Sequence, residues 1–249
     1  MKNKKELSLK NLLIPTPSGK LEEYIRKGMK NDGSIYAFII SYINKNNIYN
    51  IIINKKFILA IPKKLKQNIK LVVSHIDNTY EKCFMIKNGN FYIGTFDNSI
   101  GIFTSLNLLN NNYDDVIFCY TDCEETDMSG IKELNIYMQE KLKNYSFKYI
   151  ILDVTEENVN VSTTIENSNL DIYETNDIRI IQNEKCGYDE SKYLLNKKNI
   201  NTCSICAVLL MRNEKDYCHN RKGNYIKIVN INKYKKNVKA IIERELWEK

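Results

Sequence analysis

The feature that most constrains the fold is an alternation of short apolar runs with segments of helical spacing. Continuous runs of β-branched and aromatic residues predict strands, whereas apolar residues three or four positions apart predict helices. Strands are expected over residues 35–43, 48–53, 57–61, 71–73, 91–93, 116–120, 149–152, 159–165, 178–181, 203–210 and 225–229. Helices are expected over residues 21–27, 98–109, 131–142, 191–196 and 234–247. This order predicts an α/β fold: a doubly wound, mixed but mostly parallel sheet with helices on both faces.

Length and composition are those of a globular chain. The 249 residues are 43% hydrophobic and 27% charged, which excludes a disordered protein. No repeat, linker or low-complexity tract divides the chain, so we expect one domain over residues 1–249. No apolar run approaches the roughly 20 residues that a bilayer requires, and the charged N-terminus lacks the apolar core of a signal peptide. The sequence therefore predicts a soluble, unexported protein with no membrane partner.

The cysteines indicate the cellular compartment of the protein, and the distribution of charge indicates which binding partners to expect. The seven cysteines are odd in number and lie scattered through apolar stretches, which favours reduced thiols and predicts a cytoplasmic protein. The 37 basic and 30 acidic residues give a net charge of +7, but the excess is lysine spread along the whole chain. Because no basic patch is concentrated anywhere, we expect no nucleic-acid partner.

The chain has two histidines, His75 and His219, and each follows an apolar, strand-like segment. On an extended segment, residues two apart share a face, so Asp77 can bind the ring nitrogen of His75 that faces away from a metal. The same residues could instead form an ordinary polar cap at the end of a strand.

Acidic residues follow three other predicted strands. Asp97 lies between a strand and a helix, where it could also serve as the helix N-cap. Glu124 and Glu125 follow a strand that reads as fully buried, although adjacent acids also occur in solvated loops. Asp153 follows the next such strand. Imidazole and carboxylate groups gathered at the strand ends of one sheet suit two divalent cations.

Six blocks of sequence, in order along nearly the whole chain, resemble the co-catalytic di-zinc exopeptidase clan. This clan includes the glutamyl aminopeptidase, peptidase T, dizinc carboxypeptidase and aminoacylase families. The matching blocks are residues 12–23 (LLIPTPSGKLEE), 75–79 (HIDNT), 97–101 (DNSIG), 121–125 (TDCEE), 152–153 (LD) and 218–220 (CHN).

The resemblance implies two divalent metal ions, Zn with Co or Mn as alternatives. Asp97 would bridge the two ions. His75 and Asp153 would complete one metal site, and Glu125 and His219 would complete the other.

The resemblance also implies the catalytic residues. Glu124 would be the general base and Asp77 would orient His75. The family further leads us to expect a cis peptide bond between Asp97 and Asn98.

The implied reaction is hydrolysis of a peptide or amide bond by a metal-bridging water. We expect an aminopeptidase acting on short peptides, with acylated amino acids as the other possible substrates. The gaps between His75 and Asp97 and between Asp153 and His219 are too short for an inserted lid domain, so we expect a bare catalytic domain. The sequence leaves the oligomeric state open.

Two alternatives remain. The chain could be a non-catalytic, metal-binding pseudoenzyme that serves as a binding or assembly module, although Glu124 then has no reason to persist beside metal ligands. Alternatively, Cys203 and Cys206 could form a zinc knuckle with Cys218 and His219. The apolar run around Cys203 and Cys206 reads as a buried strand, which disfavours the knuckle.

Overall fold

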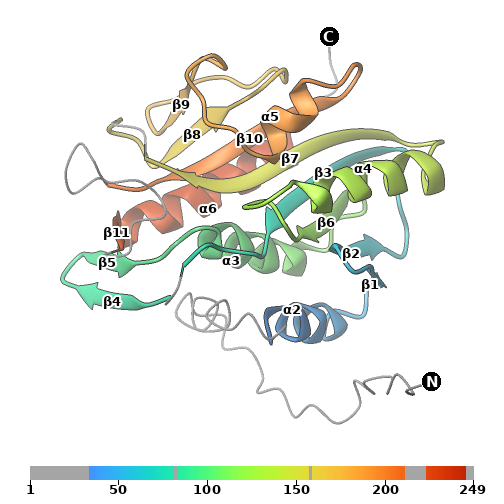
Figure 1. Ribbon diagram of the computed structural model, residues 1–249, viewed down its shortest axis with the longest axis horizontal. Coiled ribbons are helices and arrows are strands. Elements are labelled where there is room, and N and C mark those ends of the chain that lie inside the picture. The colour runs from blue at the N-terminus through green and yellow to red at the C-terminus, as the bar shows by residue number, and fades with distance from the viewer. Residues whose placement is uncertain (1–33, 81–82, 157–158, 211–222, 245–249) are drawn as a thin grey trace.

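The computed structural model describes residues 34–80, 83–156, 159–210 and 223–244, and its centre is an eight-stranded sheet (Figure 1). In sheet order the strands are β1 (Tyr49–Ile53), β2 (Phe57–Pro62), β6 (Val116–Thr121), β3 (Asn68–His75), β7 (Ser146–Thr155), β10 (Asn201–Val208), β8 (Thr163–Glu166) and β9 (Ile178–Ile180). The four central strands β6, β3, β7 and β10 run parallel, whereas β2 and β8 flank them antiparallel. The expected mixed, mostly parallel sheet is confirmed.

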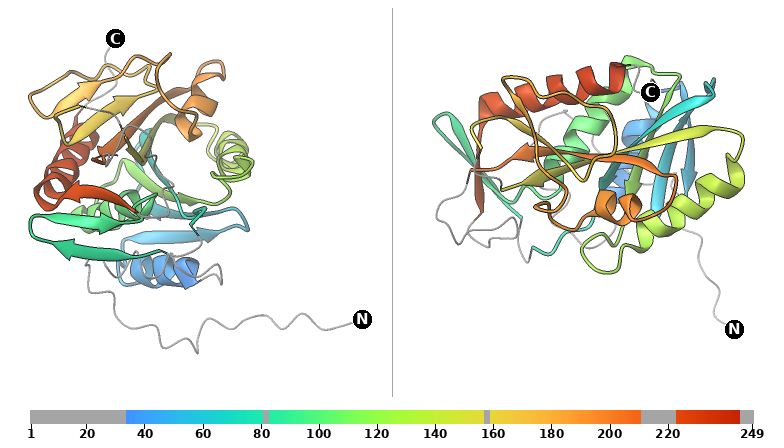
Figure 2. Two further views of the ribbon diagram at one scale, coloured as in Figure 1. Left: turned by 60° about the vertical axis from the view of Figure 1, so that its left-hand side comes forward. Right: turned by 90° about the horizontal axis from the view of Figure 1, so that it is seen from above.

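Helices cover both faces of this sheet. One face packs against α2 (Ser34–Asn44), α3 (Ser99–Leu108), which continues into a short 3₁₀ turn, and α6 (Ile228–Glu243). The other face packs against α4 (Ser129–Lys141) and α5 (Glu190–Leu195). The right-hand view of Figure 2 shows α6 along one side of the sheet with α4 and α5 on the opposite side. None of the helices in the described residues combines the length and the apolar character needed to cross a membrane.

The central strands are apolar throughout because both of their faces are covered. β6 is buried at every residue, and β3 is buried at all but its first. Successive side chains point to opposite faces. Val72 therefore packs into the core beneath α3, whereas Leu71 and Val73 pack beneath α4.

A second, three-stranded sheet stands at one end of the molecule (Figure 1). It consists of the hairpin β4 (Met85–Asn88) and β5 (Phe91–Gly94), to which β11 (Asn224–Lys227) adds an antiparallel strand. At Gly94 a Cβ atom would come within 2.3 Å of the Phe84 carbonyl oxygen, so only glycine fits. The hairpin ends at Gly94, and the chain then continues to Asp97 and α3.

Two expectations about the elements are corrected. Residues 35–43 form helix α2 and not a strand, since their buried side chains Ile35, Phe38, Ile39 and Ile43 recur at helical spacing. The strand expected over residues 225–229 ends at Lys227, because α6 begins at the next residue. Strand β4 was not anticipated. The helix expected over residues 21–27 lies outside the described residues.

A pair of substitutions in α4 tests how the helix is anchored. Ile131 is fully buried and Ile136 is 55% exposed on the same helix. We expect Ile131→Ala to lower the free energy of unfolding by about 2–5 kcal/mol, because it leaves a cavity against the sheet. Ile136→Ala should change it by no more than about 0.5 kcal/mol. Urea titration followed by circular dichroism measures both values, and equal losses would contradict the packing described here.

Candidate metal centre

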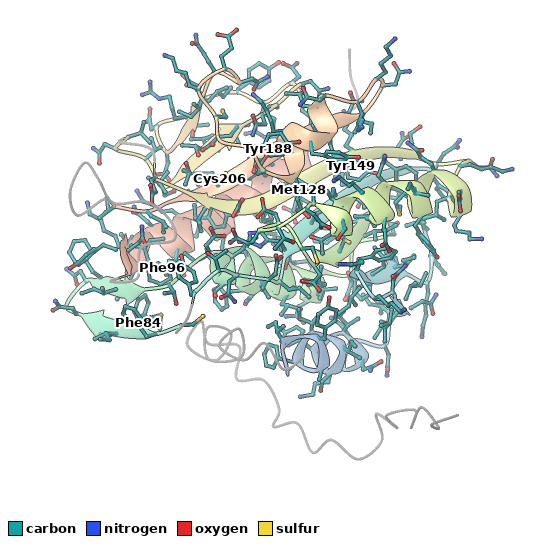
Figure 3. The ribbon with its side chains drawn as sticks, in the orientation of Figure 1. Phe84, Phe96, Met128, Tyr149, Tyr188 and Cys206 are labelled. Carbon is teal, nitrogen blue, oxygen red and sulfur yellow. The ribbon has the colours of Figure 1, made fainter. Side chains whose placement is uncertain are left out.

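Five of the predicted site residues converge at the carboxyl ends of the parallel strands β3, β6 and β7. His75 is the last residue of β3, Glu124 and Glu125 follow β6, and Asp153 lies near the end of β7. Asp97 arrives from the small sheet. Neighbouring parallel strands end at the same edge, which brings these distant segments together. Figure 3 labels two residues that neighbour members of the site: Phe96 directly precedes Asp97 in the chain, and Cys206 on β10 pairs with Asp153 on β7.

The His75 ring is the centre of the cluster. Its Nε2 lies 3.0 Å from Asp97 Oδ1 and 3.5 Å from Asp153 Oδ1, and its side chain is only 1% exposed. These three side chains offer ligand atoms that lie within 4.8 Å of one another, and so do His75, Glu124 and Glu125. The two groups share the imidazole, so all five side chains belong to one cluster.

Asp97 is not the N-cap of α3, a role that the sequence left open. The N-cap of α3 is Asn98, whose Oδ1 accepts a hydrogen bond from the Gly101 amide at 3.1 Å. Its Nδ2 donates to the Leu152 carbonyl at 2.6 Å, next to Asp153. The bond between Asp97 and Asn98 is cis, as the resemblance implied. Asn98 thus joins the start of α3 to β7 and leaves the Asp97 carboxylate to face His75.

Asp77 makes contacts with two parts of the site. Its backbone carbonyl lies 3.1 Å from His75 Nδ1, and its carboxylate lies 3.6 Å from the same atom. The two carboxylate oxygens also accept hydrogen bonds from the Glu124 and Glu125 amides, each at 3.1 Å. The sequence predicted the contact with His75. The contact with the loop of the paired glutamates was not predicted.

Burial has the largest effect on the acidic groups of the cluster, and the crowding of like charges adds to it. Burial raises the pKa values of Glu124, Glu125 and Asp153, and neighbouring carboxylates raise them further against the opposing effect of His75. Burial by itself would lower the pKa of His75, yet its hydrogen bonds to three aspartates raise that pKa well above its ordinary value. Burial pushes the pKa of Asp77 upward, but His75 and the two amides outweigh it and the pKa falls. These carboxyl groups are therefore costly to ionise without a positive partner, so the cluster is suited to cations that would take the place of the bound protons.

The positions of Cys203 and Cys206 are incompatible with the zinc-knuckle alternative. Cys203 and Cys206 both lie in β10 and are 0% and 2% exposed. Residues three apart on a strand point to opposite faces, so these thiols cannot bind one ion together. His219 and Cys218 lie outside the described residues. The predicted metal ligand His219 therefore stays a prediction.

Glu190 is a residue of this region that the sequence did not single out. It is the first residue of α5, its side chain is completely buried, and neither carboxyl oxygen makes a hydrogen bond of normal geometry within the described residues. Burial raises its pKa to about 8; His75 and the Thr121 hydroxyl oppose the rise, and Asp153 adds to it. An acid at the start of a helix usually reads as an exposed partner of the helix dipole, so no sequence signal marked it.

The Glu190 carboxyl predicts a pH-dependent stability in metal-free protein. Its folded pKa lies above its ordinary value of 4.5, so between the two values the folded protein retains a proton that the unfolded chain loses. Stability therefore falls as pH rises through this window. We expect Glu190→Gln to raise the free energy of unfolding by roughly 1–3 kcal/mol near pH 8 and to leave it nearly unchanged near pH 5.

Urea titrations of both proteins at the two pH values measure this difference. The matched control is Glu133→Gln, which replaces an exposed acid of α4 and should change stability little at either pH. A Glu190→Gln effect of equal size at both pH values would contradict the assignment.

The fold is shared with solved aminopeptidases. An aminopeptidase from the archaeon Desulfurococcus kamchatkensis superposes with a TM-score of 0.66 at 11% identity, over 92% of this chain and 96% of that one. The TET1 peptidase of Pyrococcus horikoshii gives 0.64 at 12% identity, over 90% and 99%. A zinc aminopeptidase from Bacillus subtilis gives 0.51 at 16% identity, over 78% and 51%.

At the level of sequence, no family model and no curated protein matches the chain. The structural likeness, at these low identities, is a likeness of fold. The protein therefore shares the α/β fold of these solved aminopeptidases.

Proposed function

We propose that this protein is a metal-dependent hydrolase of peptide or amide bonds, an aminopeptidase acting on short peptides, with residues 1–249 forming one catalytic domain. The observation that carries the proposal is the convergence of His75 with Asp97 and Asp153 and also with Glu124 and Glu125. These residues come from four separate segments of the chain. The fold shared with known aminopeptidases supports the same reaction class.

The donor set fits two divalent cations. Asp97, His75 and Asp153 would hold one ion, and Asp97 and Glu125 would hold the other together with His219. Carboxylate-rich sites with imidazole accept Zn, Co or Mn. The crowded negative charge of the cluster supports such an occupant, because cations relieve the repulsion among the carboxylates.

Glu124 has the position of a general base. It is partly buried beside the cluster, and burial raises the pKa of its carboxyl group, which makes the carboxylate a stronger proton acceptor. Divalent ions held at the site would lower the pKa of the attacking water from about 15.7 towards about 7 and polarise the scissile carbonyl. Glu124 takes the proton from this water and passes it to the leaving amine.

Asp77 positions both the His75 ring and the loop that carries Glu124 and Glu125. Its backbone carbonyl faces Nδ1 of His75, which leaves Nε2 directed at Asp97 and Asp153. Its carboxylate holds the amides of Glu124 and Glu125. A single aspartate therefore couples the orientation of the metal-facing imidazole to the position of the general base.

Glu124→Gln tests the proposed reaction. We expect it to lower kcat on a panel of aminoacyl amides and short peptides by roughly 10²–10⁴-fold, because the side chain can no longer accept a proton. Metal content should stay near that of the wild type, as measured by plasma mass spectrometry. If both proteins bind metal and are equally inert across a broad panel that includes N-acyl amino acids, the protein is a binding module and the hydrolase proposal is wrong.

Asp77→Asn tests the metal centre separately from the chemistry. We expect metal affinity to fall roughly 10–100-fold, because the neutral amide supports His75 and the glutamate loop less well. Competition with a chelating dye measures the affinity. Asp114→Asn is the matched control, since Asp114 makes an exposed ion pair with Lys66 and should leave the affinity unchanged. Equal affinities in all three proteins would contradict the role of Asp77.

A further inference from the structure

Lys56 and Cys123 form a close pair beside the candidate centre that the proposed hydrolysis does not use. Lys56 Nζ lies 2.8 Å from Cys123 Sγ. This is the length of a hydrogen bond to oxygen, so it is a short contact for the larger sulfur atom. The amine and the thiol, two nucleophilic groups, are thus already in contact.

Backbone hydrogen bonds hold the two residues together. The Asp122 amide donates to the Lys56 carbonyl at 2.9 Å, which joins the turn before β2 to the loop after β6. The Cys123 amide donates to Asp122 Oδ1 at 2.9 Å, and its carbonyl accepts from the Met128 amide at 2.7 Å. Tyr36 from α2 donates to Asp122 Oδ2 at 2.8 Å. The pair therefore does not depend on its own side-chain contact to stay in place.

Cys123 differs from the other described cysteines in its surroundings. Both it and Lys56 are partly exposed, whereas Cys83, Cys119, Cys203 and Cys206 are buried. Cys186 is also partly exposed, but its thiol faces the carbonyls of residues 181 and 182. A cation beside an accessible thiol is the setting in which cysteines oxidise readily. Every described cysteine is free of a disulfide bond, and the Cys123 thiol is in contact with the Lys56 amine.

We propose that Lys56 and Cys123 are a redox-sensitive modification site, in which a peroxide joins them through a reversible covalent S–N bond. The Cys123 sulfur attacks hydrogen peroxide, the O–O bond breaks, and a sulfenic acid and one water form. The Lys56 ammonium then loses one proton to solvent, and the resulting neutral amine attacks the sulfenic sulfur. The S–N bond forms, the S–O bond breaks, and the hydroxyl leaves as a second water with a proton from the amine.

The sulfur loses two electrons in this sequence and the peroxide gains them. A dithiol reverses the modification, because its thiolate attacks the sulfur, breaks the S–N bond and releases the protonated amine. A second thiol of the same reagent then frees Cys123.

The consequence for activity rests on the proposed function. Cys123 directly precedes Glu124, so the bond would tether the loop of the general base to the turn before β2. We expect oxidation to lower hydrolytic activity at least about tenfold, as displacement of a catalytic group by about 1 Å already costs on the order of 10²-fold. Dithiothreitol should restore the activity.

The experiment treats the metal-loaded, full-length protein with hydrogen peroxide and maps the products by peptide mass spectrometry. We expect one linked pair of peptides, carrying Lys56 and Cys123, whose mass is two hydrogens below the sum of the separate peptides and which dithiothreitol separates. Lys56→Arg keeps the positive charge but lacks the amine, and it should show only sulfenic and sulfinic forms of Cys123. Cys186 is the internal control, and it should oxidise without a link to lysine.

The mass spectra alone decide whether the cross-link exists. Oxidation of Cys123 to sulfinic acid with Lys56 unmodified in the wild type would overturn the proposal, and so would oxidation of Cys186 while Cys123 remains a thiol. Activity is read separately. A linked protein that retains full activity would overturn the inhibitory consequence, whereas a reduced protein without activity would count against the proposed hydrolase and leave the cross-link result intact.

Discussion

The rest of the site depends on one buried imidazole held among carboxylates at the ends of parallel strands. His75 is almost fully buried, and Asp97, Asp153 and Asp77 approach its two ring nitrogens. Such a concentration of negative charge is costly in a folded protein, as the raised pKa values of the neighbouring acids indicate. A fold that maintains this arrangement is suited to binding cations, and the packing of the central strands supplies the rigidity that it needs.

The supporting contacts connect the parts of the site to one another. Asn98 joins the start of α3 to β7, and Asp77 joins the end of β3 to the loop after β6. Each contact links a residue beside one proposed ligand to the backbone beside another. The geometry of the centre is therefore distributed over the sheet and does not rest on a single loop, which is the usual way in which a precise site is built on a rigid scaffold.

The same loop carries both the proposed chemistry and the proposed modification. Glu124 and Cys123 are neighbours, so a bond formed at the sulfur would act on the base through the backbone. Lys56 lies in the turn before β2, on the side of the loop away from β7 in the order of the sheet. In this arrangement an oxidant could act on the loop without a change to the ligands on β3 and β7.

The sequence by itself determined the fold class and the order of the site residues. Continuous apolar runs predicted the central strands, and acids placed directly after them predicted where a site would form, because parallel strands end at one edge. Tertiary structure decided what local pattern could not. Residues 35–43 became a helix because one side of them packs on the sheet, Asn98 took the capping role beside Asp97, and Glu190 was buried by the docking of α5. The packing of α2 on the sheet, the bond from Asn98 to the Leu152 carbonyl and the docking of α5 are contacts between segments distant in the chain, and local sequence does not specify which segments meet.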